Sequence, residues 1–252
     1  MDVVLLTALG VGGATVVGSA IGFLFKSPSH KLNDIILSFA AGVMLASSVV
    51  GLIIPSLEGG SKWSILITAL GILLGAVCLN IIDRLVPHLH KMSDKDIELH
   101  PASADRLNKV MLFVIAIAIH NFPEGVAAGV SFGTGNTMQA LAVAGGIALQ
   151  NIPEGMVIIA PMIAAGVSKK KTFLIALLTG IIEVVGTMLG YFAVSISGAI
   201  LPFALAFAGG TMLYVISDEM IPETHSHGAE RGATYSLLIG FIVMLAFDFF
   251  LG

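Results

Sequence analysis

The sequence predicts an all-α, polytopic membrane protein with eight transmembrane helices, and three observations predict it. Of the 252 residues, 56% are hydrophobic and only 11% are charged, whereas a soluble domain carries about 25% charged residues. The mean hydropathy of the chain is +0.99. A transmembrane helix needs about 20 mostly apolar residues, so the chain has room for about eight helices with short connectors. We therefore expect residues 1–252 to form a single transmembrane domain.

Apolar stretches separated by polar connectors define the individual spans. The first stretch lacks the basic start and the cleavage site of a signal peptide, so we expect it to be the first span. The connector at residues 86–109 is long and polar and contains three histidines, so we expect it to be solvated. The expected spans are residues 3–25, 34–56, 63–85, 110–131, 138–164, 172–195, 200–221 and 233–251.

Pairs of glycines four residues apart recur along four of these spans. In lipid, close packing rather than hydrophobic burial holds helices together, and glycine lets two backbones approach each other. We expect the pairs to lie where two helices touch. They are Gly18 with Gly22, Gly71 with Gly75, Gly129 with Gly133, and Gly186 with Gly190.

Lysine and arginine are distributed unevenly over the connectors, which predicts the orientation of the chain. If the connector after the first span is numbered one, the even connectors hold only Lys62. The odd connectors and the residues bordering them hold Lys26, Lys31, Arg84, Lys91, Lys95, Arg106, Lys109, Lys169, Lys170, Lys171 and Arg231. Because cytoplasmic connectors are rich in basic residues, we expect the odd connectors in the cytoplasm and both termini outside the cell membrane.

The composition also excludes some partners and some types of site. The chain has no basic patch, and its only basic run is Lys169 to Lys171, so we expect no nucleic-acid partner. Cys78 is the single cysteine, which excludes an intrachain disulfide framework and a thiolate metal cluster. The expected partners are the lipid bilayer and divalent metal ions, with a homodimer as an open alternative.

A six-residue pattern occurs twice, 30 positions apart, inside the fourth and fifth spans. It reads His-Asn-Phe-Pro-Glu-Gly at residues 120–125 and Gln-Asn-Ile-Pro-Glu-Gly at residues 150–155. Consecutive spans run antiparallel, so the two copies are expected to face each other across a pseudo-two-fold axis near the membrane plane. Inverted repeats of this kind build their ion sites at the repeat interface, near the bilayer midplane.

The spacing within each copy places the polar side chains on one helix face. His120 and Glu124 are four residues apart, as are Gln150 and Glu154, and residues at this spacing are neighbours on a helix surface. Pro123, like its counterpart in the fifth span, cannot donate a hydrogen bond to the carbonyl one turn earlier. Each helix is therefore expected to bend beside its polar residues and to leave a backbone oxygen available.

Three acidic residues, Glu124, Glu154 and Glu183, lie inside otherwise apolar spans. A charged side chain at the centre of a transmembrane helix costs about 3 kcal/mol on insertion scales. No lysine or arginine lies at a comparable depth, so the carboxyl groups must be protonated, hydrated or bound to a cation. The cation hypothesis uses all three acids together with an imidazole.

The ligand types narrow the choice of cation. Magnesium and calcium prefer oxygen ligands alone, whereas a histidine among carboxylates suits zinc, iron, manganese or cadmium. Met44 could add a thioether, although methionine in an apolar helix is more often a packing residue.

These residues resemble those of the ZIP (Zrt/Irt-like) family of metal-ion transporters, and specifically its bacterial GufA-like branch. The resemblance covers essentially the whole chain and rests most on the paired Pro-Glu-Gly motifs. It implies transport of divalent transition-metal ions into the cytoplasm by alternating access, with Zn2+ as the expected substrate and Cd2+, Fe2+ or Mn2+ as substitutes. The chain is accordingly expected not to be an enzyme.

The resemblance also implies a centre for two metal ions. The first site would use Met44, His120, Glu124, Gln150 and Glu154. The second would use Asn121, Asn151 and Glu183, with Glu124 and Glu154 bridging the two ions. Bridging carboxylates offset the repulsion between two divalent ions.

Further positions are expected at the ends of the route. Glu58 matches an acidic entrance residue of the family, and Asp218 with Glu219 matches an exit position. His225 and His227 could collect metal in the cytoplasm. Simple solvation is the alternative interpretation for each histidine and for Glu58, and an interfacial helix end is the alternative for the acidic pair.

Three other functions remain open from the sequence. A metal-selective channel would use the same site but would conduct rather than alternate its access. An intramembrane metallohydrolase would need an activated water and a base, commonly in His-Glu-x-x-His, and that motif is absent. A membrane scaffold without transport would leave the buried acids unexplained.

Overall fold

The computed structural model describes residues 1–25, 29–58, 62–85 and 103–251. The regular structure of these ranges is helical, without a β-strand. The long helices are α1 (Asp2–Gly22), α2 (His30–Ala46), α4 (Ser64–Leu85), α6 (Ser103–Ser131), α7 (Thr137–Ala164), α8 (Lys169–Ile196), α9 (Leu201–Val215) and α11 (Glu230–Leu251). The short ones are η1 (Ser47–Ile53), α3 (Ile54–Leu57), η2 (Phe132–Thr134), η3 (Gly198–Ile200), η4 (Ile216–Met220) and α10 (Ile221–Thr224).

Seven stretches of the described chain are long and apolar enough to cross a membrane. Two of them are composite: α2, η1 and α3 form one, and η3, α9, η4 and α10 form another. Helix α6, with 29 residues, is the eighth long helix. The prediction of an all-α, multi-pass membrane protein is therefore confirmed.

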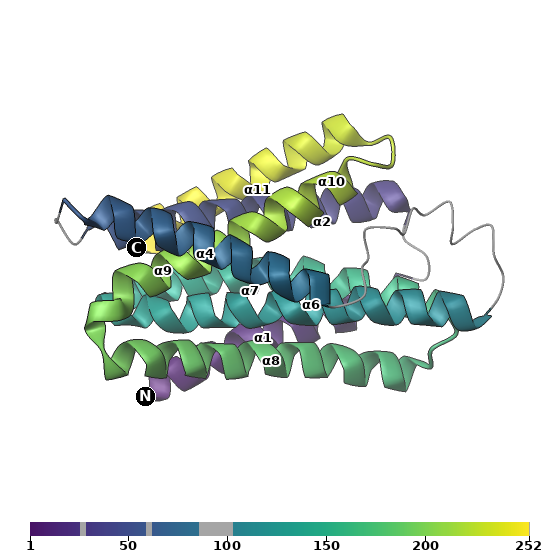
Figure 1. The fold of residues 1–252 in the computed structure, drawn as a ribbon. Helices are drawn as coiled ribbons and strands as arrows, with labels where there is room; N and C mark the ends of the chain where they lie inside the picture. Colours follow the sequence, from purple (N-terminus) through teal and green to yellow (C-terminus); the bar gives the residue numbers. More distant parts are fainter. Residues whose placement is uncertain (26–28, 59–61, 86–102, 252) are drawn as a thin grey trace.

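The helices form two groups that lie against each other (Figure 1). In the first group, α6 packs along α8 and α1 packs along α7. In the second group, α4 packs along α9 and α2 packs along α11. Contacts between α2 and α7 and between α6 and α9 join the two groups. Both termini lie at the same end of the bundle.

An internal two-fold relation connects the two halves of the chain. Exchanging α1 with α8, α6 with α7, α2 with α9 and α4 with α11 converts each of these helix pairs into another observed pair. The relation extends to detail, because α2 and α9 each continue into a π-helix that ends before an Ile-Pro step, at Pro55 and at Pro222. A proline has no N–H to donate to the preceding turn, and a π-helical turn accommodates that loss.

Close helix approach occurs at every one of the glycine pairs named above. A Cβ atom at Gly18 would meet the backbone of Ile152, and one at Gly75 would meet the backbone of Phe207. Gly129 and Gly190 lie in the same way against backbone oxygens of the opposing helix. The prediction that these glycines mark helix contacts is confirmed.

The outer surfaces of α4 and α11 are apolar and exposed. In the most apolar 18-residue stretch of each helix, only 22% of α4 and 17% of α11 is buried within the chain. Large side chains such as Leu70 and Ile242 lie more than half exposed on these helices. Contiguous apolar surface of this extent fits contact with lipid.

The structure differs from the predicted spans mainly at α6 and α2. Helix α6 begins at Ser103, so residues 103–109 of the predicted connector are helical. Hydropathy placed the start of the fourth span at residue 110 because residues 103–109 are mostly polar, but several of them are good helix formers. Helix α2 begins at His30, where the Ser29 side chain accepts a hydrogen bond from the Leu32 N–H. The connector histidines His88, His90 and His100 lie outside the described residues.

Candidate metal centre

Four helices bring the predicted ligands into the interior. Seven of the eight residues are buried, each with less than a tenth of its surface exposed. They are Met44 on α2, Asn121 and Glu124 on α6, Gln150, Asn151 and Glu154 on α7, and Glu183 on α8. His120 is partly buried.

Glu183 lies at the centre of a hydrogen-bond network that joins four helices. Its Oε1 accepts a hydrogen bond from the hydroxyl of Thr15 on α1 at 2.7 Å and another from the side-chain amide of Asn121. Its Oε2 accepts a hydrogen bond from the amide of Asn151 at 2.6 Å. The same Asn151 amide also donates to the carbonyl oxygen of Val11 at 3.2 Å.

The glycines of the repeated motif explain how the helices come so close. A Cβ at Gly125 would meet the backbone of Glu183, and a Cβ at Gly155 would meet the backbone of Thr15. The first Pro-Glu-Gly motif therefore packs on α8 beside Glu183, and the second packs on α1 beside Thr15. The internal two-fold relation exchanges α6 with α7 and α8 with α1, so it converts the first contact into the second. Thr15 therefore occupies the position equivalent to Glu183.

Glu124 lies within electrostatic range of Glu154 and Glu183. Glu124 on α6 therefore has a carboxylate of α7 and one of α8 in its neighbourhood. No lysine or arginine occurs in residues 110–164 or 172–196, which include the whole of α7 and the parts of α6 and α8 that carry these acids. Three neighbouring carboxylates without a basic partner form a strongly cation-attracting environment.

Most of the buried polar atoms that lack a hydrogen-bond partner belong to the predicted ligands. Among the described residues, these atoms are both carboxylate oxygens of Glu124, Oε1 of Glu154, both amide atoms of Gln150, and the Oδ1 atoms of Asn121 and Asn151. Leaving such a group unpaired costs about 1–3 kcal/mol. All of these atoms except the amide nitrogen of Gln150 are oxygens, and oxygens with unused lone pairs are chemically suited to a divalent cation.

The cluster mixes carboxylate and amide oxygens. Within the ranges that the structure describes, no three His, Cys, Asp or Glu side chains are grouped so that they could hold one metal ion. His120, one of the predicted ligands, lies with its Nε2 2.9 Å from Oε1 of Glu219. Glu219 is on η4, so this contact joins α6 in the first helix group to η4 in the second.

Met44 lies in the main hydrophobic core. It is 1% exposed and clusters with Val143 and Ile147 of α7. This environment suits packing, and it also places a thioether beside the helix that carries Gln150 and Glu154.

The predicted entrance and exit acids lie apart from one another. Glu58 is exposed just after α3, at the opposite end of the second span from His30. Asp218 is exposed and accepts a hydrogen bond from the hydroxyl of Tyr214 at 3.1 Å. Tyr214 in turn accepts one from the amide of Asn80 at 2.7 Å. Glu219, expected at an exit position, lies instead against His120.

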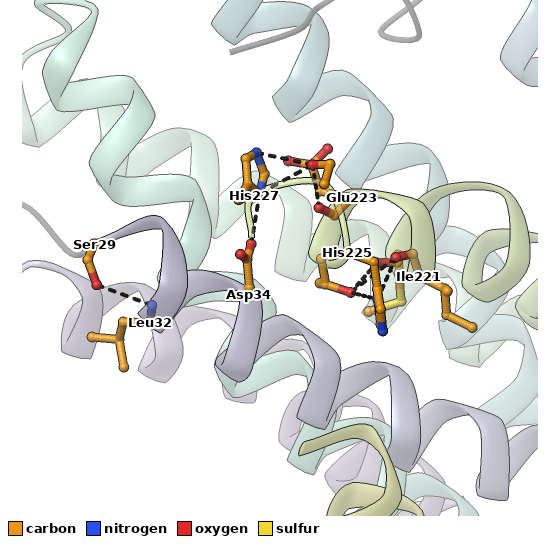
Figure 2. Close-up of polar contacts among 10 residues, drawn as sticks. Ser29, Leu32, Asp34, Ile221, Glu223, His225 and His227 are labelled. Atoms are coloured by element: carbon orange, nitrogen blue, oxygen red, sulfur yellow. Dashed lines mark hydrogen bonds and ion pairs between the residues drawn. The ribbon is translucent and has the colours of Figure 1, made fainter. Parts of the chain in front are cut away.

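The two loop histidines make contacts that hold the turn between α10 and α11 (Figure 2). His225 Nδ1 lies 2.9 Å from the carbonyl oxygen of Ile221, and its Nε2 lies 3.0 Å from the hydroxyl of Thr234. His227 Nδ1 lies 3.0 Å from Oδ1 of Asp34, and its ring stacks on that of His30. Both histidines are partly buried. They are therefore not simply solvated loop residues, which was the alternative interpretation.

Two residues of these networks were not found from the sequence. Thr15 and Asp34 are both buried, but hydropathy does not distinguish a threonine in an apolar span from a packing residue. A threonine hydroxyl in a helix usually bonds to its own backbone. The only available signal was the inverted repeat, which pairs Thr15 with Glu183.

Comparison with known proteins gives an independent result. A family model described as "ZIP Zinc transporter" matches residues 93–248. The chain is 41% identical to "Zinc transporter GufA" of Myxococcus xanthus, with 98% of each chain covered. It is 36% identical to "Zinc transporter ZIPB" of Bordetella bronchiseptica, over 95% of this chain and 78% of that one. It is also 36% identical to "Zinc transporter ZupT" of Chlorobaculum parvum, over 92% of this chain and 91% of the other.

Proposed function

Because this chain belongs to the ZIP zinc transporter family, we propose that it carries zinc ions into the cytoplasm through the buried centre between α6, α7 and α8. The observation that carries this proposal is the group of buried oxygens on Glu124, Gln150 and Glu154, whose two carboxylates have no basic partner. Transport, rather than catalysis, is the activity of this family, so the metallohydrolase hypothesis is discarded.

The centre is proposed to hold two ions. The first would be bound by Glu124, Gln150 and Glu154, together with Met44 and with His120 once it has left Glu219. The second would be bound by the oxygens of Asn121 and Asn151 and by Glu183, with Glu124 and Glu154 bridging. Two divalent ions bring four positive charges and the three carboxylates bring three negative ones, so the bridging acids limit the repulsion between the ions. The same donors would accept Cd2+, Fe2+ or Mn2+.

Alternating access is proposed to occur by movement of the α1, α6, α7 and α8 group against the other group. The division of the helices into two groups supports this, because contacts within each group are more extensive than those between them. The contact between His120 and Glu219 crosses the boundary between the two groups. A zinc ion that takes the His120 imidazole as a ligand competes with this pair, so metal binding would weaken a link between the groups.

Zinc influx into proteoliposomes tests the proposal. We expect uptake by the purified protein to saturate with zinc concentration and to depend steeply on temperature, as movement of a helix group requires. Flux that rises linearly with concentration and changes little with temperature would instead support the metal-selective channel. Light scattering of the detergent-solubilised protein measures its molar mass and so shows whether it is a monomer or a homodimer.

The orientation is proposed to have the odd connectors in the cytoplasm and both termini outside. We expect Lys62→Cys, in a Cys78→Ser background, to react with a membrane-impermeant maleimide in intact cells. Lys170→Cys is the matched control, because it is also an exposed lysine at a helix end. It should react only after the membrane is permeabilised. The reverse pattern would invert the proposed orientation.

A further inference from the structure

We propose that Thr15 is a positioning residue of the metal centre, which fixes Glu183 so that Asn121 and Asn151 present their oxygens to the ion. This inference rests on the proposed function, because it assigns a role within the same site. Thr15 lies on α1, a helix that carries none of the predicted ligands. Its side chain is completely buried.

The hydrogen bond of Thr15 is unusual for a threonine in this structure. Thr7, Thr179 and Thr187 donate to carbonyl oxygens of their own helices, at 2.8 to 2.9 Å. The Thr15 hydroxyl donates instead to the carboxylate of Glu183, on a helix 168 residues further along the chain. A hydrogen bond to a charged acceptor is about twice as strong as a neutral one. Thr15 therefore stabilises a particular position of Glu183.

The position of Glu183 determines which way the two asparagine side chains turn. A carboxylate can only accept hydrogen bonds, so it selects the NH2 ends of Asn121 and Asn151. Their Oδ1 atoms are then left buried without a hydrogen-bond partner. These oxygens are the donors that an ion requires. Without Glu183 the Asn121 amide could turn over and present its NH2 group instead, whereas Asn151 would keep one hydrogen bond, to the carbonyl oxygen of Val11.

Glu183 itself has little remaining capacity to bind metal. A carboxylate has about four lone-pair positions, and three of them are taken by Thr15, Asn121 and Asn151. It can bind an ion through one remaining position while it orients the two asparagines. Orientation of ligands by outer hydrogen bonds commonly changes metal affinity by about 10–100-fold.

The internal two-fold relation explains why a hydroxyl is suited to this position. Gly155 packs on the backbone of Thr15 as Gly125 packs on that of Glu183, so the two residues are equivalent. A second carboxylate at residue 15 would add repulsion to a site that already holds three. A hydroxyl donor supports the carboxylate opposite it instead.

Thr15→Val tests the inference, because valine keeps the shape of the side chain and removes the hydroxyl. In proteoliposomes, we expect the KM for zinc to rise about tenfold with little change in the maximal rate. Thr15→Ser restores the hydroxyl, and its KM should lie near the wild-type value. Thr179→Val is the matched control, since Thr179 is buried but donates only to its own helix. It should leave the KM unchanged.

The ratio of Mn2+ to Cd2+ uptake is a second measurement. It would stay unchanged if Thr15 only stabilised the fold. Manganese depends more on oxygen ligands than cadmium does, so Thr15→Val should reduce Mn2+ uptake several-fold more than Cd2+ uptake. If Thr15→Val does not assemble in the membrane, Thr15→Ala is compared with Thr15→Ser in the same way. An unchanged zinc KM and an unchanged Mn2+/Cd2+ ratio in a well-expressed Thr15→Val or Thr15→Ala protein would overturn the inference.

Failure of this inference can be told apart from failure of the proposed function. If Glu124→Gln abolishes uptake while Thr15→Val behaves as wild type, the centre transports metal and only the role of Thr15 is wrong. If Glu124→Gln transports normally, the proposed centre itself is wrong.

Discussion

Replacing Glu124 or Glu154 with glutamine is expected to reduce zinc uptake to the background of empty vesicles. Glutamine keeps the size and one oxygen of the side chain but removes the negative charge that attracts and bridges the ions. A zinc ion bound in the buried centre would lose one of its negatively charged partners, and the loss of such a partner costs about 3–5 kcal/mol. This free energy corresponds to at least about a hundredfold weaker binding of zinc. Both carboxylates are almost fully buried, so water cannot replace them.

Uptake of radioactive zinc into vesicles with equal amounts of each variant measures this effect. Glu230→Gln serves as the matched control, because Glu230 is exposed at the start of α11 and away from the centre. It should transport at the wild-type rate. Normal uptake by both the Glu124 and the Glu154 variants would show that zinc passes elsewhere.

Gly18→Ala is expected to have the second large effect, on stability. The added Cβ would overlap the backbone of Ile152, next to Asn151 in the second motif, so α1 would have to move away from α7. Overpacking of this kind typically costs about 1–3 kcal/mol, and a backbone neighbour cannot rotate away as a side chain can. The shift of α1 would also displace Thr15 from Glu183.

Thermal unfolding of the detergent-purified protein measures the loss, with a lowered Tm expected for Gly18→Ala. Gly13→Ala is the matched control on the same helix, because a Cβ at Gly13 has no neighbouring atom within 4 Å. It should keep or raise the Tm, since alanine favours helix over glycine. An equal Tm for the two variants would mean that close approach at Gly18 does not stabilise the bundle.

Much of the fold could be predicted because the bilayer imposes simple rules on the sequence. Apolar length located the spans, and the repeated Pro-Glu-Gly motif indicated the inverted relation between α6 and α7. The start of α6 could not be found in this way, because residues 103–109 are polar but helical. Hydropathy reports where a helix meets lipid, not where it ends in water.

The candidate site was predictable in its residue types but not in its internal contacts. Buried acids without a basic partner identified Glu124, Glu154 and Glu183, because charge in an apolar span demands an explanation. The hydrogen bond from Thr15 and the contact between His120 and Glu219 depend on tertiary structure. The π-helix η4 places Glu219, and helical periodicity alone does not predict such a turn.

Crystals soaked in zinc and measured at the zinc absorption edge test the central claim most directly, since anomalous scattering locates the metal without assuming its ligands. The account predicts anomalous density between α6 and α7, in contact with the carboxylates of Glu124 and Glu154. Density confined to the ends of the bundle, with none beside these two carboxylates, would contradict it.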